Sequence, residues 1–180
     1  MATQRLIHAA VSKHFKKMDY IGQYFGFETY YLDIDEEDFN AVIPENNWFC
    51  CAITNNENYD KSLVDKFIRL AIDRNILSWH GLGKYGGSLH LAFDLTITEM
   101  EVNENHPEID VCTIGDSSEN IADQFWGCFG ASCLPGTVVD YSIVKLICLS
   151  FDRYNYKYEL TEYINKFNDG WLPPDSNQND

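Results

Sequence analysis

The sequence predicts an α/β fold: a single three-layer, sandwich-like domain with helices on both faces of a mixed β-sheet. Between residues 48 and 149, and leaving aside the ambiguous residues 89–100, segments follow the order strand, helix, strand, strand, helix, strand. Residues 48–54 are a continuous apolar run, typical of a strand covered on both faces, and residues 76–80 are a second such candidate. The chain has 180 residues, of which 45% are hydrophobic, so it can bury the core of one domain.

An added amphipathic helix is expected over residues 1–20. Its apolar residues recur at steps of three and four, with lysines opposite: Leu6, Ile7, Ala10, Val11, His14, Phe15 and Met18. No linker divides the chain, so the domain should span residues 1–170.

The first half of the domain alternates strands and a helix. Residues 27–34 are aromatic and alternating, which predicts a strand, and residues 48–54 form the buried strand already noted. A helix over residues 60–74 has one apolar face, and either Asp60 or Ser62 can cap it.

Residues 89–100 fit two periodicities. The apolar positions of a strand alternate strictly, at Leu89, Leu91, Phe93, Leu95 and Ile97. A helix would use Leu89, Phe93, Ile97 and Met100 instead. The strict alternation favours the strand.

The second half should hold a core strand at residues 109–114 and a helix that Asp116 or Ser117 caps. That helix carries Ile121, Phe125, Trp126 and Phe129, and Pro135-Gly136 should end it. Three segments complete the expected fold: a strand at 143–149, a helix at 158–167 and a frayed, acidic tail at 171–180.

Charged residues are distributed unevenly along the chain. The formal net charge is −15, yet the first 17 residues hold four bases and no acid. The remainder has 28 acidic against 9 basic side chains, a balance of −19. Such a field repels nucleic acid and anionic membrane and attracts a basic protein partner. No run approaches the ~18 apolar residues of a membrane span, and the N-terminus lacks a signal-like apolar stretch, so a cytoplasmic protein is expected.

The cysteines predict neither a metal site nor a cofactor. They are Cys50, Cys51, Cys112, Cys128, Cys133 and Cys148. The spacing of Cys128 and Cys133 has no matching second pair, as structural zinc would require. In the cytosol they should be reduced thiols that pack as small apolar residues.

Acidic residues concentrate after the first predicted strand. We expect Asp33, Asp35, Glu36, Glu37 and Asp38 to form an acidic docking face, with Tyr30, Tyr31 and Trp48 as its central contacts. A second cluster is Glu99, Glu101, Glu104, Glu108 and Asp110. A solvated, solubilising surface is the alternative interpretation, and a hard-cation site is a further one, although no calcium-binding loop pattern is present.

Residues 81–86, GLGKYG, match the G-x-G-x-x-G pattern of phosphate-binding loops. A dinucleotide loop joins a strand to a helix, whereas here a second strand is expected to follow. The sequence therefore favours a flexible loop between two strands, with phosphate binding as the alternative.

An alternative site combines His80, His90, Asp94 and Asp116. His90 and Asp94 share a face in a strand or a helix, and a carboxylate that orients an imidazole can support base catalysis. His80 could lie nearby at its strand end. If strands 48–54 and 109–114 were neighbours, Asp116 would share a crevice with the residues after Ile53. This group would suit a small enzyme or ligand-binding domain.

Residues 111–118, VCTIGDSS, together with Trp79-His80, resemble a strand junction of small uncharacterised bacterial α/β proteins. That resemblance implies the fold. By class, the chain is similar to the immunity proteins of bacterial toxin systems, which are small acidic domains that block a basic, often nucleic-acid-directed toxin. The leading interpretation is therefore a non-enzymatic inhibitor that binds a basic toxin through its acidic face; the oligomeric state is left open.

Overall fold

A computed structural model describes residues 18–34, 39–130, 134–135, 138 and 140–174. One six-stranded sheet has the order β1-β2-β6-β3-β4-β5, in which β1 pairs antiparallel with β2 and the remaining neighbours are parallel. The strands are β1 (Asp19–Tyr24), β2 (Phe27–Leu32), β3 (Trp48–Ile53), β4 (Ser78–Leu82), β5 (Cys112–Gly115) and β6 (Lys145–Ser150). The helices are α1 (Phe39–Val42), α2 (Lys61–Asp73), α3 (Gly86–Asn103), α4 (Ile121–Gly130) and α5 (Lys157–Asn168), with a 3-10 turn at Tyr141–Ile143.

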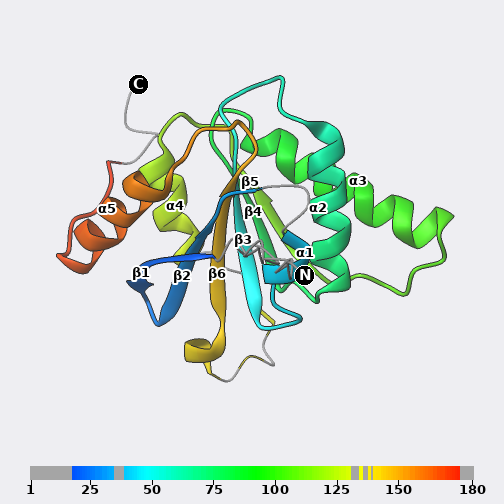
Figure 1. Cartoon of the computed structure of the whole chain (residues 1–180), viewed down its shortest axis with the longest axis horizontal. Coiled ribbons are helices and arrows are strands. Elements are labelled where there is room, and N and C mark those ends of the chain that lie inside the picture. Colours follow the sequence, from blue (N-terminus) through cyan, green and yellow to red (C-terminus); the bar gives the residue numbers. More distant parts are fainter. Residues whose placement is uncertain (1–17, 35–38, 131–133, 136–137, 139, 175–180) are drawn as a thin grey trace, which may run out of the picture.

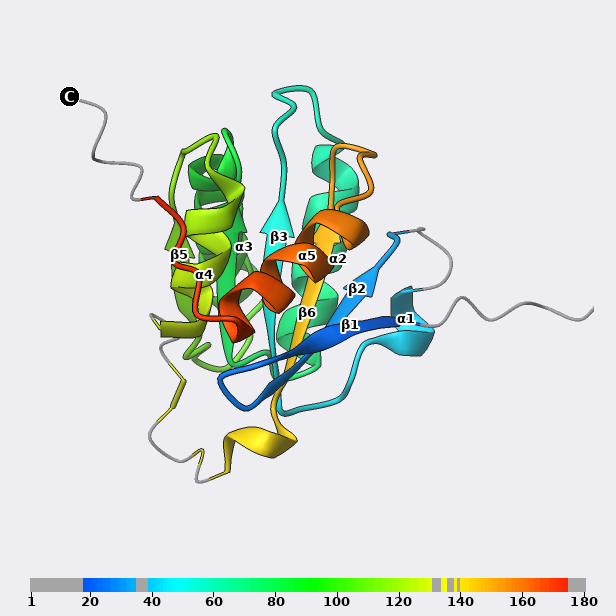
Figure 2. The same ribbon diagram turned by 90° about the vertical axis from the view of Figure 1, so that its left-hand side faces the viewer.

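The helices cover both faces of the sheet, which confirms the three-layer α/β prediction. In Figure 1 the sheet is seen nearly edge-on, with α4 and α5 on one side and α2 and α3 on the other. Figure 2 looks onto the face that α4 and α5 cover. Within the described part of the chain, no helix is both long and apolar enough to cross a membrane.

Strand β3 supplies both halves of the core. Trp48, Cys50 and Ala52 face α1, α2 and α3, whereas the alternate residues Phe49, Cys51 and Ile53 face α4 and α5. All six side chains are fully buried, as expected for a central strand of a parallel sheet. The apolar run over residues 48–54 is therefore confirmed as a strand covered on both faces.

The N-terminal helix prediction is wrong where the structure describes the chain. Residues 1–17 lie outside the described ranges, but Asp19 already belongs to β1. Phe25 and Gly26 both have positive φ, at 54° and 90°, and they connect β1 to β2. Two such residues make the tight turn whose twist suits a hairpin, so β1 and β2 form a β-hairpin.

Residues 89–100 form a helix, not a strand. They belong to α3, in which Leu89, Phe93 and Met100 are buried on one side. Leu91 and Leu95 are 56% and 60% exposed, respectively. These two exposed leucines completed the alternation that imitated a strand.

The last part of the chain also differs from expectation. Strand β5 is a half-buried edge strand, not a core strand. Asn120 caps α4, because its Oδ1 accepts the backbone N–H of Asp123 at 3.2 Å; neither Asp116 nor Ser117 does so. The described part of α4 runs to Gly130, and residues 131–133 lie outside the described ranges, so the expected end at Pro135 stays a prediction.

Trp171 and Pro174 contact the helices, although the sequence predicts a frayed tail from residue 171. The Trp171 ring stacks on Phe167 with 6.0 Å between ring centres and an interplanar angle of 6°. Asn120 Nδ2 donates to the carbonyl oxygen of Pro174 at 2.8 Å. Aromatic stacking thus holds this segment against α5, and residues 175–180 lie outside the described ranges.

Strand order creates a switch point at the middle of the sheet. After β3 the chain enters α2 on one face, and after the neighbouring β6 it enters α5 on the other. Because these two connections diverge, their strand ends leave a crevice between them.

The junction of β4, α3 and β5 depends on a close backbone approach at Gly86. A Cβ there would overlap the carbonyl oxygens of Asp116 and Gly81, which are backbone atoms and cannot move away easily. We expect Gly86→Ala to lower the free energy of unfolding by about 2 kcal/mol or more in urea denaturation. Gly127→Ala is the control, because no atom of the described residues lies within 4 Å of its added Cβ, and it should be neutral or stabilise by up to about 1 kcal/mol. Equal denaturation midpoints for the two variants would contradict this account.

Candidate functional site

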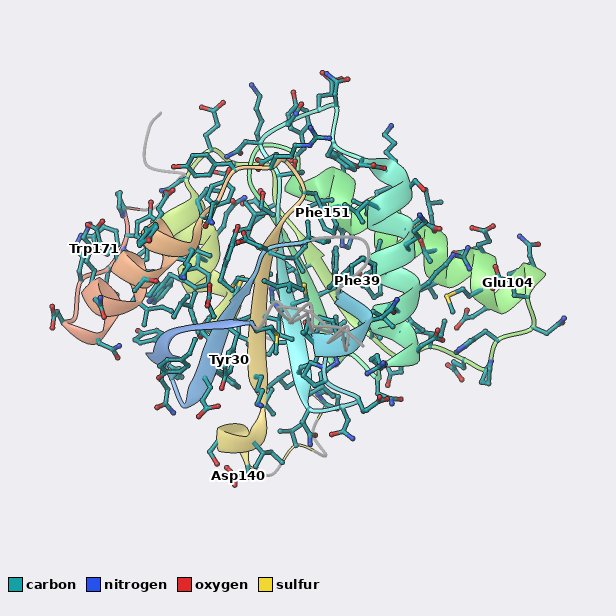
Figure 3. All side chains as sticks on the ribbon, viewed as in Figure 1. Tyr30, Phe39, Glu104, Asp140, Phe151 and Trp171 are labelled. Carbon is teal, nitrogen blue, oxygen red and sulfur yellow. The ribbon has the colours of Figure 1, made fainter. Side chains whose placement is uncertain are left out.

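The switch point holds a crevice of about 910 Å³. Its walls are the segments that follow the carboxyl ends of β2, β3 and β6. In Figure 3, Phe151, the first residue after β6, lies at the upper end of the sheet, where these segments converge. The lining is mixed. Most of its residues are polar: Asp33, Asn56, Asn58, Tyr59, Asp60, Ser150, Asp152, Arg153, Tyr154 and Asn155. The others are Tyr31, Ile34, Leu63 and Phe151.

The Asp152 carboxylate holds the crevice together. Its Oδ2 accepts the backbone N–H of Asn55 at 2.8 Å and the hydroxyl of Tyr156 at 3.1 Å. Its Oδ1 accepts the Ser150 hydroxyl at 2.5 Å and the backbone N–H of Tyr154 at 3.0 Å. One side chain thereby connects the segment after β3 to the segment after β6. Charge-assisted hydrogen bonds of this kind are stronger than neutral ones.

Asn55 extends this network to the next strand. Its Nδ2 donates to the Tyr156 hydroxyl at 2.9 Å, and its Oδ1 accepts the backbone N–H of Lys84 at 2.7 Å. Burial raises the pKa values of Tyr156 and Tyr31 well above the ordinary tyrosine value, and the nearby Asp152 carboxylate adds to both shifts. Both phenols are therefore neutral hydrogen-bonding groups at physiological pH.

Two exposed carboxylates give the crevice its charge. Asp33 follows β2 and accepts one hydrogen bond, from Asn155 Nδ2 at 3.3 Å. Asp60 caps α2 through Oδ1, which accepts two backbone N–H groups. Among the described lining residues, Arg153 is the only one with a basic side chain. The crevice therefore carries three carboxylates, those of Asp33, Asp60 and Asp152, against one guanidinium.

The expected docking residues separate into groups. Asp33 lies on the crevice, and residues 35–38 lie outside the described ranges. Tyr30 is half-buried, with Lys145 Nζ 5.4 Å from its ring centre. The prediction that Trp48 and Tyr31 are central docking contacts is corrected by their burial. They are 0% and 2% exposed, so neither can contact a partner as an exposed anchor. Trp48 packs in the core and its Nε1 donates to the carbonyl of Arg74.

The sequence analysis missed Asp60, Asp152, Tyr59 and Tyr154 as site residues. A signal was present, because Asp60 and Asp152 both follow apolar strands that end at the same edge of a parallel sheet. Sequence reasoning applies that rule to the residues after 48–54 and after 109–114, and Asn56, which follows 48–54, does line the crevice. Strand β4 lies between β3 and β5, so the condition for a crevice shared by their ends is not met.

The glycine-rich segment joins a strand to a helix, not two strands as predicted. It follows β4 and opens α3. Three successive N–H groups are used within the chain: Gly83 donates to Gln124 Oε1, Lys84 to Asn55 Oδ1 and Tyr85 to the carbonyl of Thr54. These donors bind other segments of the protein, so the glycine-rich segment here joins neighbouring segments to one another.

His90 and Asp94 form the pair that their spacing predicts. His90 Nε2 lies 3.2 Å from Asp94 Oδ2, one turn along α3. Thr113 on β5 donates its hydroxyl to Asp94 Oδ1 at 2.8 Å. His90 Nδ1 is buried and has no hydrogen-bond partner among the residues that the structure describes.

His80 does not join this pair. Its ring lies 6.0 Å from that of Phe49, on the face that α4 and α5 cover, whereas α3 lies on the opposite face. Asp116 lines a small cavity together with His80. The predicted four-residue site is therefore divided by the sheet into His90 with Asp94 and His80 with Asp116.

Metal ligands do not converge in the described part of the chain. No group of three or more His, Cys, Asp or Glu side chains is placed to hold an ion there. Cys50, Cys51, Cys112, Cys128 and Cys148 are free thiols, and all but the half-buried Cys112 are buried. Cys133 lies outside the described residues.

Fold and site together define the class: an α/β protein with a crevice at the carboxyl ends of its parallel strands. No protein-family model matches the chain, and no curated protein or solved structure is significantly similar to it.

The Asp152 network should contribute strongly to stability. Asp152→Asn replaces two acceptor oxygens by one and weakens charge-assisted bonds, so we expect a loss of about 1.5–3 kcal/mol in the free energy of unfolding. Asp33→Asn is the matched control and should change it by less than about 0.5 kcal/mol, since that side chain is exposed. Urea denaturation measures both, and comparable losses would refute the central role of Asp152.

The raised pKa values of Tyr31 and Tyr156 predict that the folded protein loses stability at alkaline pH. Their folded-state pKa values lie above the unfolded value of 10.0. Their contribution is therefore complete below about pH 10 and is lost as pH rises toward the folded values. Tyr156→Phe should flatten the fall of the melting temperature between about pH 9 and 11. Tyr158→Phe, at an 81% exposed position, should leave the slope unchanged.

Proposed function

We propose that this protein is a non-enzymatic, acidic binding protein, an immunity-type inhibitor that neutralises a basic toxin by direct contact. Its docking face is the acidic crevice, defined by Asp33, Asp60, Asp152, Tyr59 and Tyr154. The supporting observation is that carboxylates from three separate segments converge on one cavity beside aromatic side chains. This arrangement suits the lysine and arginine side chains of a basic protein.

Several acidic side chains outside the crevice are paired with bases. Arg69 on α2 contacts Asp65, Glu99 and Glu104, so its guanidinium offsets part of the charge of that cluster. Lys157 pairs with Asp19 and Lys166 with Glu162 in the same way. The crevice carboxylates have only Arg153 beside them among the described lining residues, and in the sequence four further acids follow at 35–38.

Such a surface favours fast and specific association. Uncompensated carboxylates steer a basic partner toward the crevice and raise the association rate, most strongly at low salt. Tyr154 is 57% exposed, and its ring contacts that of Tyr156 edge-on with 4.5 Å between ring centres. An aromatic side chain held in this way can pack on the aliphatic part of an incoming lysine or arginine and attract its charge.

The test is affinity capture from the native host's lysate at low and then physiological salt, followed by mass spectrometry. The crevice variant is Asp33→Asn with Asp60→Asn; asparagine preserves the cap of α2. The control, Glu108→Gln with Asp110→Asn, removes the same charge from two exposed residues that precede β5. The wild type and the control should retain one basic protein at physiological salt, and the crevice variant should bind it at least about tenfold more weakly.

The captured protein, once purified, must also lose its own activity when the wild-type chain is added in equal amount. Equal retention by the crevice variant would refute the assignment of the face. Capture without inhibition would refute the inhibitor role.

A further inference from the structure

A second, smaller cavity of about 240 Å³ lies between α4 and the carboxyl ends of β4 and β5. His80, Asp116, Asp123, Trp126 and Cys128 are among its lining residues. It shares no lining residue with the acidic crevice. The cavity brings a thiol and an imidazole together on the face of the sheet that α4 covers.

We propose that Cys128 is a modification site, a thiol that reacts with a small hydroperoxide in this cavity while His80 acts as its base. The proposal stands apart from the inhibitor role, because it uses a different cavity and different residues.

The His80 imidazole is fixed for this role. It is 2% exposed, and its Nε2 lies 3.0 Å from the Ser78 hydroxyl. That hydroxyl donates its single proton to the carbonyl of Cys112 at 3.1 Å, so it accepts the N–H of the imidazole. Nδ1 is then the ring nitrogen left to take a proton. The Cys128 thiol lines the same cavity, and its interaction with this imidazole lowers the pKa of the thiol.

The surroundings of Cys128 favour its thiolate. Burial by itself raises the pKa of the thiol, but hydrogen bonding with Cys51 and the charge of His80 outweigh burial and lower the pKa to about 6. The thiol donates a hydrogen bond to the carbonyl oxygen of Gln124 on the preceding turn, with 3.2 Å between Sγ and the oxygen, and this bond is given up when the thiolate forms. The titratable groups that face it from the packed elements and the cavity are His80 (β4), Cys51 (β3), Cys148 (β6), Asp116 (after β5) and Asp123 (α4).

The cavity selects a small, neutral oxidant. Cys128 is 2% exposed, so a bulky reagent cannot reach its sulfur without opening the structure. Asp116 and Asp123 lie on the cavity wall and disfavour anions. Hydrogen peroxide meets both conditions, whereas a large anionic disulfide meets neither.

The reaction balances with the groups present. The Cys128 thiolate attacks one peroxide oxygen, the O–O bond breaks, and the departing hydroxide takes the proton held by His80 to form water. Cysteine is oxidised to the sulfenic acid as the peroxide is reduced. Cys51, which contacts Cys128, then attacks the oxidised sulfur through its own sulfur, and a second water leaves as the disulfide forms.

The experiment is timed exposure of the whole chain to hydrogen peroxide between about pH 5 and pH 9, followed by unfolding, alkylation of the remaining thiols and peptide mass spectrometry. Cys128 should lose its free thiol first, and a Cys51–Cys128 cross-linked peptide should accumulate. The rate should rise with pH around about pH 6 and then level off, because the thiolate is the reactive form. Initial loss at the half-buried Cys112 would overturn the proposal.

Two variants test the part played by His80. His80→Asn should slow the oxidation of Cys128 at pH 7 by about tenfold or more and move the rise of the rate toward about pH 8.5. Cys50→Ala, on the opposite face of the sheet, should leave the rate unchanged. An unaltered pH profile in His80→Asn would overturn the role of the imidazole. If His80→Asn fails to fold, Ser78→Ala serves instead, since it removes the hydroxyl that fixes the ring, and it should likewise slow oxidation and shift the profile.

Discussion

Strand β6 is the last strand of the chain, yet it pairs in parallel with both β2 and β3 at the centre of the sheet. Its insertion there depends on burial, because every β6 side chain after Lys145 is buried and must be covered by helices on both faces. Once β6 lies beside β3, the connections that follow the two strands must diverge, and the crevice forms between them. The Asp152 carboxylate then connects the two diverging segments and gives the crevice a defined shape.

The two proposed sites use the same sheet in different ways. The acidic crevice is a surface feature at the strand ends, where unpaired carboxylates keep contact with water and act over a distance. The Cys128 cavity depends on burial, because a low dielectric strengthens the interaction between the thiol and the His80 imidazole. Salt should therefore weaken binding at the crevice and change the reactivity of Cys128 little.

Periodicity predicts the helices and strands whose buried residues follow a regular pattern along the chain. Strand β3 is apolar at every position, and α2 has one apolar face and a capping aspartate, so both were placed within a residue or two. Helix α3 was predicted wrongly because Leu91 and Leu95 are exposed, and no local pattern distinguishes an exposed leucine from a buried one. Trp48 and Tyr31 failed as docking residues for the converse reason: large aromatic side chains suit an interface and a core equally well.

The sequence by itself determined the α/β class, the central buried strand, the helices at residues 61–73 and 157–168 and the strongly negative charge. These follow from composition and from local periodicity, which act within a few residues. Only the tertiary structure decided the strand order, the convergence of Asp33, Asp60 and Asp152 on one crevice, and the contact of Cys128 with His80. Each of these joins residues far apart in the chain, and such contacts depend on which buried faces pack together, a choice that no local pattern contains.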